Sequence, residues 1–187
     1  MAESSRTRVF VGCSLDGFIA GPNDELDWLP NLDTGEDTFT PFLAAIGAMA
    51  MGRRTFDIVE GFEGDWLYGA LPILVATHRP LSTDRPTVSA VSGPIQKVIA
   101  EAKRVAGAKD VYVDGGILIR EALDAGLVDE ITVTIVPKIL GRGIPLFAGA
   151  EKLHGLDLQE VREIGGGMVH VRYSVDDREA GEVGSGG

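Results

Sequence analysis

Short apolar runs that alternate with helix-patterned segments constrain the fold of this chain more than any other feature. Runs typical of buried strands occur at 8–13, 48–51, 71–77, 86–91, 110–116 and 130–137. The segment after Gly93-Pro94 places Ile95, Val98 and Ile99 at helical spacing, and helix-patterned segments also follow the runs at 48–51 and 110–116. This alternation predicts an α/β fold with a mostly parallel central sheet flanked by helices.

The last part of the chain departs from this alternation. Strand-like runs at 156–165 and 168–175 surround three glycines and predict a C-terminal antiparallel hairpin. Residues 14–30 are rich in Gly, Pro, Asn and Asp and predict a long functional loop, and a short helix is expected within 37–47. We expect residues 1–175 to form one domain and the acidic, then Gly/Ser-rich residues 176–187 to be a disordered tail.

Composition narrows the classes of function. The chain has 187 residues and a formal net charge of −11, which argues against nucleic acid and anionic membranes as partners. No leader sequence is visible and no apolar stretch is long enough to span a bilayer. The single cysteine, Cys13, excludes an internal disulfide. These features predict a cytoplasmic protein.

The segment at 50–60 carries the strongest sign of function. A short apolar strand ends at Gly52, and Arg53, Arg54 and Thr55 lead into a predicted helix. A glycine lets an anion approach the backbone, a helix N-terminus offers unpaired N–H groups, and a guanidinium can hold a phosphate with two hydrogen bonds. Adjacent arginines in so acidic a chain indicate a phosphate site. A strand end followed by surface arginines is the alternative interpretation.

Two further segments have the same placement at the end of a strand. Asp114-Gly115-Gly116 follows one strand, and Thr77-His78-Arg79 follows another. Taken singly, each segment is also explained by a turn. Because the carboxyl ends of parallel strands meet at one edge of a sheet, we expect all three segments to lie together. They would suit an extended ligand with several phosphates, such as NADPH.

The order of six motifs resembles the dihydrofolate reductase-like superfamily. The motifs are SLDGFIAG at 14–21, LDWL at 26–29, MGRRTF at 51–56, DGG at 114–116, LVDEI at 127–131 and IVPKILGRGIPLF at 135–147. The chain is most similar to the branch that contains the reductase domain of bacterial riboflavin biosynthesis and its stand-alone relatives. The resemblance implies a dihydrofolate reductase-like fold, NADPH as the hydride donor and a homodimer.

The resemblance also assigns residues to the cofactor. It implies that the loop after the first strand contacts the nicotinamide, that the GRRT and DGG stretches bind the diphosphate, and that the segment after the third strand holds the 2′-phosphate. The cofactor-binding candidates are Ile19, Ala20, Gly21, Gly52, Arg53, Arg54, Thr55, Thr77, His78, Arg79, Asp114, Gly115, Gly116, Ile117 and Leu118.

The substrate end is defined less well. In folate reductases a carboxylate near the start of the first helix helps to protonate the substrate, and Asp33, Glu36 and Asp37 occupy the corresponding stretch. We favour Glu36 and Asp37 as catalytic candidates, with Asp16 next, although each can equally be a solvated loop carboxylate. Aromatic residues that could line a substrate pocket are Trp28, Phe42, Phe62 and Trp66.

Together these features predict an NADPH-dependent reductase that transfers a hydride to a small, pterin- or pyrimidine-like substrate. One alternative is the riboflavin-pathway reductase that acts on a ribosylaminopyrimidine phosphate. Phe18 weakens it, because those reductases often carry lysine at that position. A non-catalytic NADPH-binding sensor is the second alternative. His154 and His170 have no partners at metal-ligand spacing, so we expect no metal.

Overall fold

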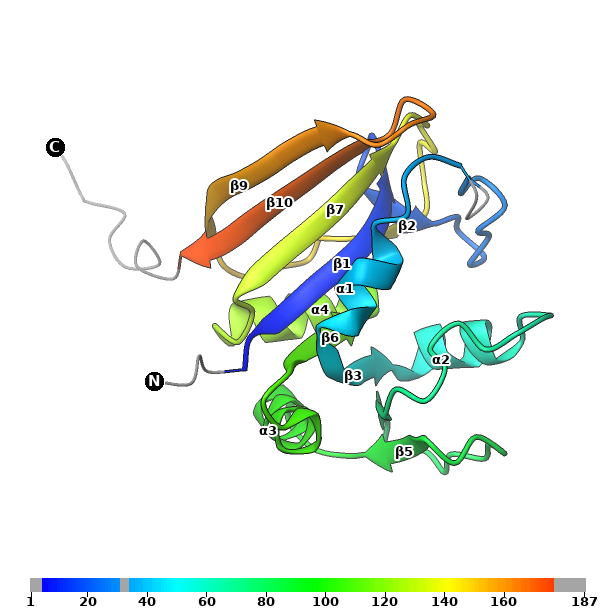
Figure 1. Ribbon diagram of the computed structural model, residues 1–187, viewed down its shortest axis with the longest axis vertical. Helices are drawn as coiled ribbons and strands as arrows, with labels where there is room; N and C mark the ends of the chain where they lie inside the picture. The colour runs from blue at the N-terminus through cyan, green and yellow to red at the C-terminus, as the bar shows by residue number, and fades with distance from the viewer. Residues whose placement is uncertain (1–4, 31–33, 177–187) are drawn as a thin grey trace, which may run out of the picture.

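An eight-stranded sheet forms the centre of the computed structural model, which describes residues 5–30 and 34–176 (Figure 1). The strand order is β5-β4-β3-β6-β1-β7-β10-β9. The first six strands in this order pair in parallel, and β10 and β9 add antiparallel pairs at one edge. The strands span Thr7–Ser14 (β1), Ile46–Gly52 (β3), Ile73–Ala76 (β4), Val88–Val91 (β5), Asp110–Asp114 (β6), Glu130–Val136 (β7), Gly155–Glu163 (β9) and Val169–Asp176 (β10).

The predicted α/β architecture, a mostly parallel sheet with a C-terminal antiparallel hairpin, is confirmed. The hairpin turns at Gly165, Gly166 and Gly167, whose φ angles of 101°, 64° and 73° lie in the region that favours glycine. Strand β10 ends at Asp176, one residue beyond the expected domain boundary. The predicted disordered tail otherwise falls at 177–187, outside the described residues.

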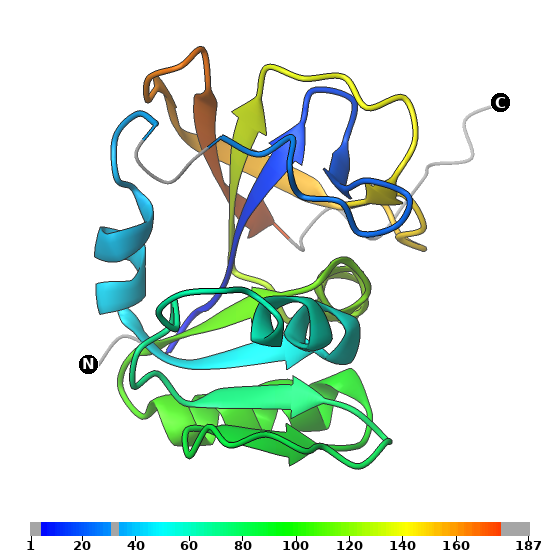
Figure 2. The same ribbon diagram turned by 90° about the vertical axis from the view of Figure 1, so that its right-hand side faces the viewer.

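Four helices in the described ranges cover the two faces of the sheet (Figures 1 and 2). Helices α3 (Ile95–Ala106) and α4 (Gly116–Asp124) bury side chains such as Val98 and Ile119 in one hydrophobic cluster. Helices α1 (Phe39–Ala44) and α2 (Arg53–Glu60) contribute Phe42 and Phe56 to a second cluster that contains Tyr112 of β6. The sheet therefore has an α3/α4 face and an α1/α2 face.

Some boundaries differ from the sequence prediction. The loop predicted at 14–30 contains a short strand, β2 (Phe18–Ala20), which pairs antiparallel with β8 (Ile144–Pro145). Three apolar residues between glycines are too short a run for a pattern to identify. The helix expected within 37–47 is also shorter, because Ile46 and the residue after it belong to β3. Small and apolar residues continue from the helix into the strand, so the sequence pattern does not show where α1 ends and β3 begins.

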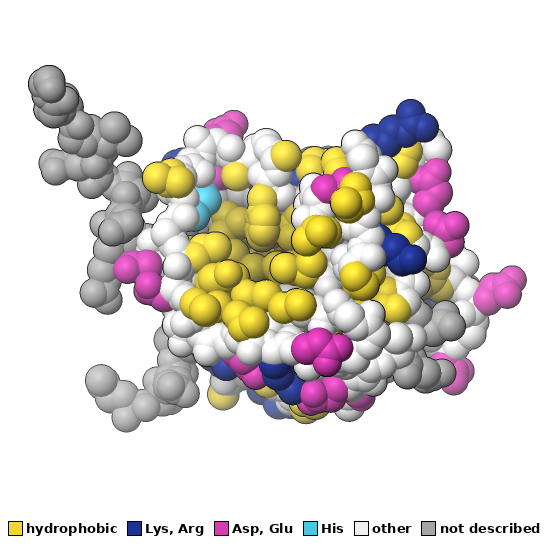
Figure 3. Space-filling model, turned by 90° about the horizontal axis from the view of Figure 1, so that it is seen from above, with side chains coloured by type: hydrophobic (Ala, Val, Ile, Leu, Met, Phe, Trp, Pro, Cys, Tyr) yellow, Lys and Arg dark blue, Asp and Glu magenta, His cyan; other side chains and the backbone are white. Residues whose placement is uncertain are grey.

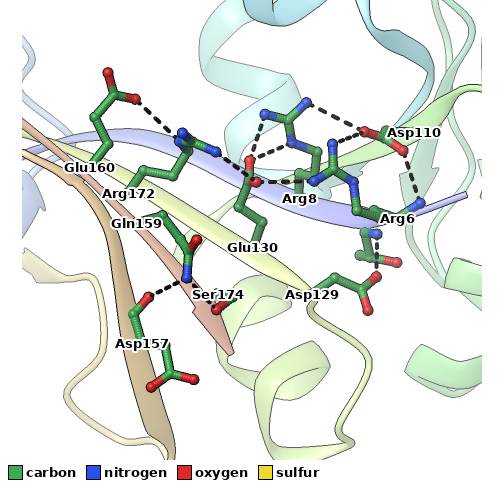
Figure 4. Close-up of polar contacts among 11 residues, drawn as sticks. Arg6, Arg8, Asp110, Asp129, Glu130, Asp157, Gln159, Glu160, Arg172 and Ser174 are labelled. Atoms are coloured by element: carbon green, nitrogen blue, oxygen red, sulfur yellow. Dashed lines mark hydrogen bonds and ion pairs between the residues drawn. The ribbon is translucent and has the colours of Figure 1, made fainter. Parts of the chain in front are cut away.

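A network of ion pairs lies on the α1/α2 face near the amino ends of β1 and β7 (Figure 4). Glu130 is only 4% exposed. Its carboxylate accepts hydrogen bonds from Arg8 at 2.7 Å and Arg6 at 3.2 Å, and Arg172 approaches to 3.5 Å. Asp110 pairs with Arg6 and Arg8 at 3.2 and 3.3 Å. These cations compensate the charge of Glu130, because burying an unpaired carboxylate has a high desolvation cost.

The opposite face of the hairpin leaves hydrophobic side chains exposed. Strand β9 pairs only with β10 and carries the exposed Leu156, Leu158 and Val161, and Leu153 precedes it. Viewed from above, hydrophobic side chains gather around a hollow in the surface (Figure 3). An apolar edge of this kind favours association unless another surface covers it.

We therefore expect a two-fold dimer, in which one self-complementary patch covers this edge. Light scattering at micromolar concentration should give the mass of two chains. Leu158→Glu, at a side chain that is 58% exposed on β9, should give single chains. Phe62→Glu is the control, because Phe62 is 44% exposed but follows α2. A single-chain mass for the unaltered protein would contradict the prediction.

Candidate active site

A cavity of about 780 Å³ lies at the edge of the sheet where β1, β3, β4, β6 and β7 end. The twist of the sheet spreads the carboxyl ends of β1 and β3 apart (Figure 2). All but one of the predicted cofactor residues line this cavity, and Gly21 is the exception. The fourteen that line it are Ile19, Ala20, Gly52, Arg53, Arg54, Thr55, Thr77, His78, Arg79, Asp114, Gly115, Gly116, Ile117 and Leu118.

The first wall of the cavity is the N-terminus of α2. Strand β3 continues into this helix at Gly52, which is the N-cap residue and makes no side-chain capping bond. Arg53 Nε donates to Asp57 at 2.7 Å, and its Nη1 donates to the carbonyl oxygen of Pro80 at 3.0 Å. The same Nη1 lies 3.4 Å from Thr77 Oγ1. Arg53 thus joins α2 to the segment after β4. Two of the three predicted phosphate-binding segments therefore lie on one side of the cavity.

The two other arginines differ in how they are held. Arg54 donates from Nε and Nη2 to Asp24 Oδ2 at 3.0 and 2.8 Å, and this carboxylate raises the pKa of Arg54. Arg79 is exposed and lies 3.5 Å from Asp57. Arg79 can therefore turn toward a phosphate more easily than Arg54, which must first give up an ion pair.

The second wall is the N-terminus of α4, which lies against the first. Gly115 is the N-cap residue of α4, with a φ of 104° and no side-chain capping bond. A Cβ at this position would lie 2.8 Å from Thr55 Oγ1 and 3.3 Å from the backbone nitrogen of Gly52. Two helix N-termini with uncapped N–H groups therefore converge on the cavity, an arrangement that suits a ligand with more than one phosphate.

Asp114 places a carboxyl group between these walls. Its Oδ1 accepts a hydrogen bond from the Gly115 N–H at 2.8 Å. Burial raises the pKa of Asp114 to about 6, and the hydrogen bond from Gly115 only partly offsets this. Asp114 and Tyr112 lie two residues apart on β6 and both line the cavity. A carboxyl with this pKa can exchange a proton near neutral pH.

We expect the raised pKa of Asp114 to make the protein less stable as the pH rises. The folded protein retains this proton up to about pH 6, whereas an unfolded aspartate loses it near pH 4. The free energy of unfolding should therefore fall between about pH 4 and pH 6. Asp114→Asn should be more stable than the unaltered protein at pH 7 by about 1–3 kcal/mol.

Urea unfolding from pH 3 to pH 8 measures this effect. The difference between the Asp114→Asn variant and the unaltered protein should disappear at the acid end of the range, where both states are protonated. Asp27→Asn, at an exposed carboxylate outside the cavity, is the control and should follow the unaltered protein throughout. Equal stability of Asp114→Asn and the unaltered protein at pH 7 would contradict a buried, destabilised carboxylate.

Asp16, expected to be catalytic, does not line the cavity. Its carboxylate accepts hydrogen bonds from Ser14 Oγ at 2.7 Å and from the N–H groups of Leu140 and Gly141 at 3.1 and 2.7 Å. Desolvation by the surrounding loops favours the neutral acid, but these hydrogen bonds outweigh it and lower the pKa of Asp16. Asp16 therefore ties the loop after β1 to the loop after β7, and the strand pair β2–β8 that these loops carry brings Ile19 to the cavity.

The other two catalytic candidates also lie away from the cavity. Glu36 is exposed and forms a bidentate contact with Arg162 of β9 at 2.6 and 2.7 Å. Asp37 accepts hydrogen bonds from the N–H groups of Thr40 and Phe39 at the start of α1, and these lower its pKa. Both carboxylates have structural partners, as the alternative interpretation held. Asp33 lies outside the described residues.

None of the four aromatic residues expected around the substrate lines the cavity. Phe42 is buried in the core cluster below it. Phe62 is exposed after α2, and Trp66 packs under the guanidinium of Arg85, 3.8 Å from the ring centroid. Trp28 donates its indole N–H to a carbonyl within its own turn. The large side chains that do line the cavity include Phe10, Leu26, Leu29, Phe39, Leu67, Tyr112 and Met168.

Strand register explains which residues take their place. Phe10 and Gly12 of β1 lie on the same sheet face as Tyr112 of β6, because Arg8 pairs with Tyr112. Thr134 of β7 pairs with Gly12 and lies on that face as well. Alternate residues of three neighbouring strands therefore form the floor of one half of the cavity. Sequence patterns predicted these strands but not their mutual register, so this half was missed.

Comparison with known structures identifies the fold. The structure superposes on a dihydrofolate reductase from Enterococcus faecalis, described as complexed with NADP(H), with a TM-score of 0.62 over 93% of this chain and 98% of that one. Sequence identity is 15%, so the likeness concerns the fold. The chain has the dihydrofolate reductase-like fold that its motifs predicted.

Sequence comparison then defines the family. The chain belongs to the RibD C-terminal domain family, whose profile matches residues 7–170. It is 31% identical over 176 residues to the uncharacterized protein YyaP of Bacillus subtilis, which covers 87% of this chain and 91% of YyaP. A Shewanella protein whose name links it to riboflavin biosynthesis matches with a TM-score of 0.81 and 29% identity, over 91% of this chain and 99% of that one. These matches support a reductase of the riboflavin or folate type.

Two further observations concern membranes and metal ions. No helix within the described ranges is long and apolar enough to cross a membrane. Among residues 5–30 and 34–176, no three His, Cys, Asp or Glu side chains gather in a way that could hold a metal ion.

Proposed function

We propose that the protein is an NADPH-dependent reductase that transfers a hydride to a C=N or C=O bond of a small heterocyclic substrate. The observation that carries the proposal is the shape of the cavity. At one end, two uncapped helix N-termini and three arginines converge, and at the other lies a chamber lined by apolar side chains. A volume of about 780 Å³ falls within the range of cofactor and ligand sites.

The residues present fit this cofactor. The N-termini of α2 and α4 would hold the diphosphate, since a Cβ at position 115 would fill the gap between the two helices. Arg53 and Arg79, beside Thr77, would hold the 2′-phosphate. Ile19 and Ala20 would lie against the nicotinamide ring, as the resemblance to folate reductases implies.

Bound NADPH would supply the hydride, and the protein would position the substrate and control the proton. Asp114 is the carboxyl group best placed for this second task, because it lines the cavity and its pKa of about 6 keeps part of it protonated near neutral pH. Asp24 also lines the cavity but is held by Arg54. We therefore propose Asp114 as the proton donor in place of Asp16, Glu36 and Asp37.

Membership of the RibD family favours one alternative, the reductase that acts on a ribosylaminopyrimidine phosphate. A non-catalytic NADPH sensor is the other. Oxidation of NADPH in the presence of a panel of pterins and aminopyrimidines separates the enzymes from the sensor. Turnover with any member of the panel would exclude the sensor.

We further propose that the protein acts in the cytoplasm as a homodimer.

We expect NADPH to bind at least ten-fold more tightly than NADH, a difference of about 1.4 kcal/mol. The reason is the positive charge of Arg53 and Arg79 next to the proposed 2′-phosphate position. Calorimetric titration of both cofactors measures the ratio. Arg53→Ala should lower it toward one, and the loss should be smaller at high salt.

Arg104→Ala is the control for that titration. Arg104 is an exposed arginine on α3, paired with Glu101, and does not line the cavity. Its removal changes the net charge by the same amount as Arg53→Ala but should leave the ratio of affinities unchanged. Equal affinities of the unaltered protein for NADPH and NADH would contradict the proposed 2′-phosphate site.

A further inference from the structure

The two halves of the cavity differ in charge. Its cationic side chains are Arg53, Arg54 and Arg79, and all three belong to α2 or to the segment after β4. His78 lies in the same segment. The other half, which we call the aromatic chamber, is lined by Phe10, Gly12, Leu26, Leu29, Pro30, Phe39, Tyr112, Thr134, Val136 and Met168. Among these described residues the aromatic chamber has no cation.

The aromatic chamber is built around three rings. The centroid of Phe39 lies 5.6 Å from that of Phe10 and 6.5 Å from that of Tyr112. The rings are inclined to one another by 50° and 72°, so they offer ring faces and edges against which a planar ligand can pack. Leu29 packs closely over Gly12, because a Cβ at position 12 would lie only 3.3 Å from Leu29 Cδ2. The chamber is therefore bounded largely by carbon atoms.

Polar groups of the aromatic chamber have partners within the protein. The hydroxyl of Tyr112 donates to the carbonyl oxygen of Phe10 at 2.8 Å. Thr134 Oγ1 lies 3.3 Å from His170 Nδ1, and burial lowers the pKa of His170, which favours the neutral ring. These groups offer little to a charged ligand. Ligand sites with apolar walls and few free polar groups take largely apolar compounds.

Among the residues that line the cavity, the charged groups next to the aromatic chamber are carboxylates. Asp114 adjoins Tyr112 at one side, and Asp24 lies in the loop that supplies Leu26 and Leu29. Asp24 is paired with Arg54, so Asp114 is the carboxyl group that a ligand in the chamber would approach. A phosphate held here would lose hydration, meet no cation among the residues that line the chamber and lie near Asp114, which is strongly unfavourable.

We infer that the aromatic chamber binds an uncharged, planar, largely apolar ring and excludes phosphorylated substrates. The inference rests on the proposed function, in that the chamber is taken as the substrate half of a reductase. It goes beyond that function by selecting among substrates, since it excludes the ribosylaminopyrimidine phosphate that family membership favours. A neutral ring with one polar edge toward Asp114 fits the groups present.

Three probes that share a ring separate these possibilities. They are 6,7-dimethylpterin, neopterin, and neopterin 3′-monophosphate, which differs from neopterin by one phosphate. Each is titrated by calorimetry into the protein, with and without saturating NADPH. We expect dimethylpterin to bind at least ten-fold more tightly than the phosphate, and neopterin to bind more tightly than its phosphate. Equal or tighter binding of the phosphate, or no binding of either neutral probe at millimolar concentration, would overturn the inference.

Leu29→Arg tests the reason for this preference. The substitution places one guanidinium next to Gly12, so the variant should bind neopterin 3′-monophosphate at least ten-fold more tightly than the unaltered protein. Phe62→Arg adds the same charge at an exposed site outside the cavity and away from the apolar β9 edge, and should leave the three affinities unchanged. If both variants change phosphate binding equally, net charge explains the effect and the inference fails.

The NADPH titration keeps the two proposals apart. If NADPH does not bind, the proposed reductase function fails, and the three probes still test the chamber in the free protein. If NADPH binds but the phosphate probe binds best, the reductase proposal stands and the inference about its substrate is wrong.

Discussion

Replacing Gly115 with alanine is expected to weaken NADPH binding at least a hundred-fold, or by about 2.7 kcal/mol. The added Cβ would lie 2.8 Å from Thr55 Oγ1 and 3.3 Å from the backbone nitrogen of Gly52. Relief of this contact has to move the N-terminus of α2 or that of α4, and both are proposed to hold the diphosphate. Calorimetric titration of NADPH into the variant measures the loss.

A matched glycine separates this effect from backbone strain. Gly107 also has a positive φ, 65°, but a Cβ there would meet nothing within 4 Å, and Gly107 does not line the cavity. Gly107→Ala should lower stability to a similar extent through its left-handed backbone, yet keep the NADPH affinity of the unaltered protein. If Gly115→Ala folds and binds NADPH normally, the two helix N-termini are not the diphosphate site.

Replacing Glu130 with glutamine is expected to lower the free energy of unfolding by about 3–5 kcal/mol. The amide keeps the shape of the side chain but removes the charge that compensates Arg8 and Arg6. Arg8 is largely buried, so its guanidinium would remain in a poorly solvated place with only Asp110 as a partner. Urea unfolding at pH 7 measures the change.

An exposed ion pair provides the control. Glu36 has a side chain that is 54% exposed and lies 2.6 Å from Arg162. Glu36→Gln should cost less than about 1 kcal/mol, because water replaces most of what an exposed pair contributes. The same variant also retests Glu36 as a proton donor, since turnover should be unaffected. A loss below 1 kcal/mol for Glu130→Gln would show that the network contributes little to stability.

The half of the cavity that we propose to bind the cofactor could be predicted from the sequence because it depends on backbone positions. Gly52 and Gly115 follow apolar strands directly, and such junctions place a helix N-terminus at the carboxyl edge of a parallel sheet whatever the rest of the fold. Gly21 was the exception, since it lies just beyond β2, a strand too short for its pattern to show.

The aromatic chamber could not be predicted in the same way. Phe10, Tyr112 and Thr134 come from three strands that are far apart in the sequence, and they share a face only because of the register of those strands. Phe42 is one turn of α1 from Phe39, yet Phe42 enters the core while Phe39 reaches the cavity. A pattern of aromatic residues does not distinguish these two orientations.

Carboxylates were misplaced for a related reason. Asp16 and Asp37 are the acids that the motifs suggest, but each accepts backbone hydrogen bonds that hold a loop or a helix start in place. Asp114 is predicted as part of the cofactor-binding DGG segment, and its raised pKa depends on burial that only the packed structure defines. The acid–base role that we propose for Asp114 therefore follows from its three-dimensional surroundings rather than from its sequence position.

A crystal structure of the protein with NADPH tests the central claim most directly. We predict that the diphosphate lies at the N-termini of α2 and α4, with the 2′-phosphate within hydrogen-bonding distance of Arg53 or Arg79. The nicotinamide should lie against Ala20 and face the aromatic chamber. A cofactor bound in the reverse direction, or no cofactor in this cavity under conditions where calorimetry shows binding, would contradict the account.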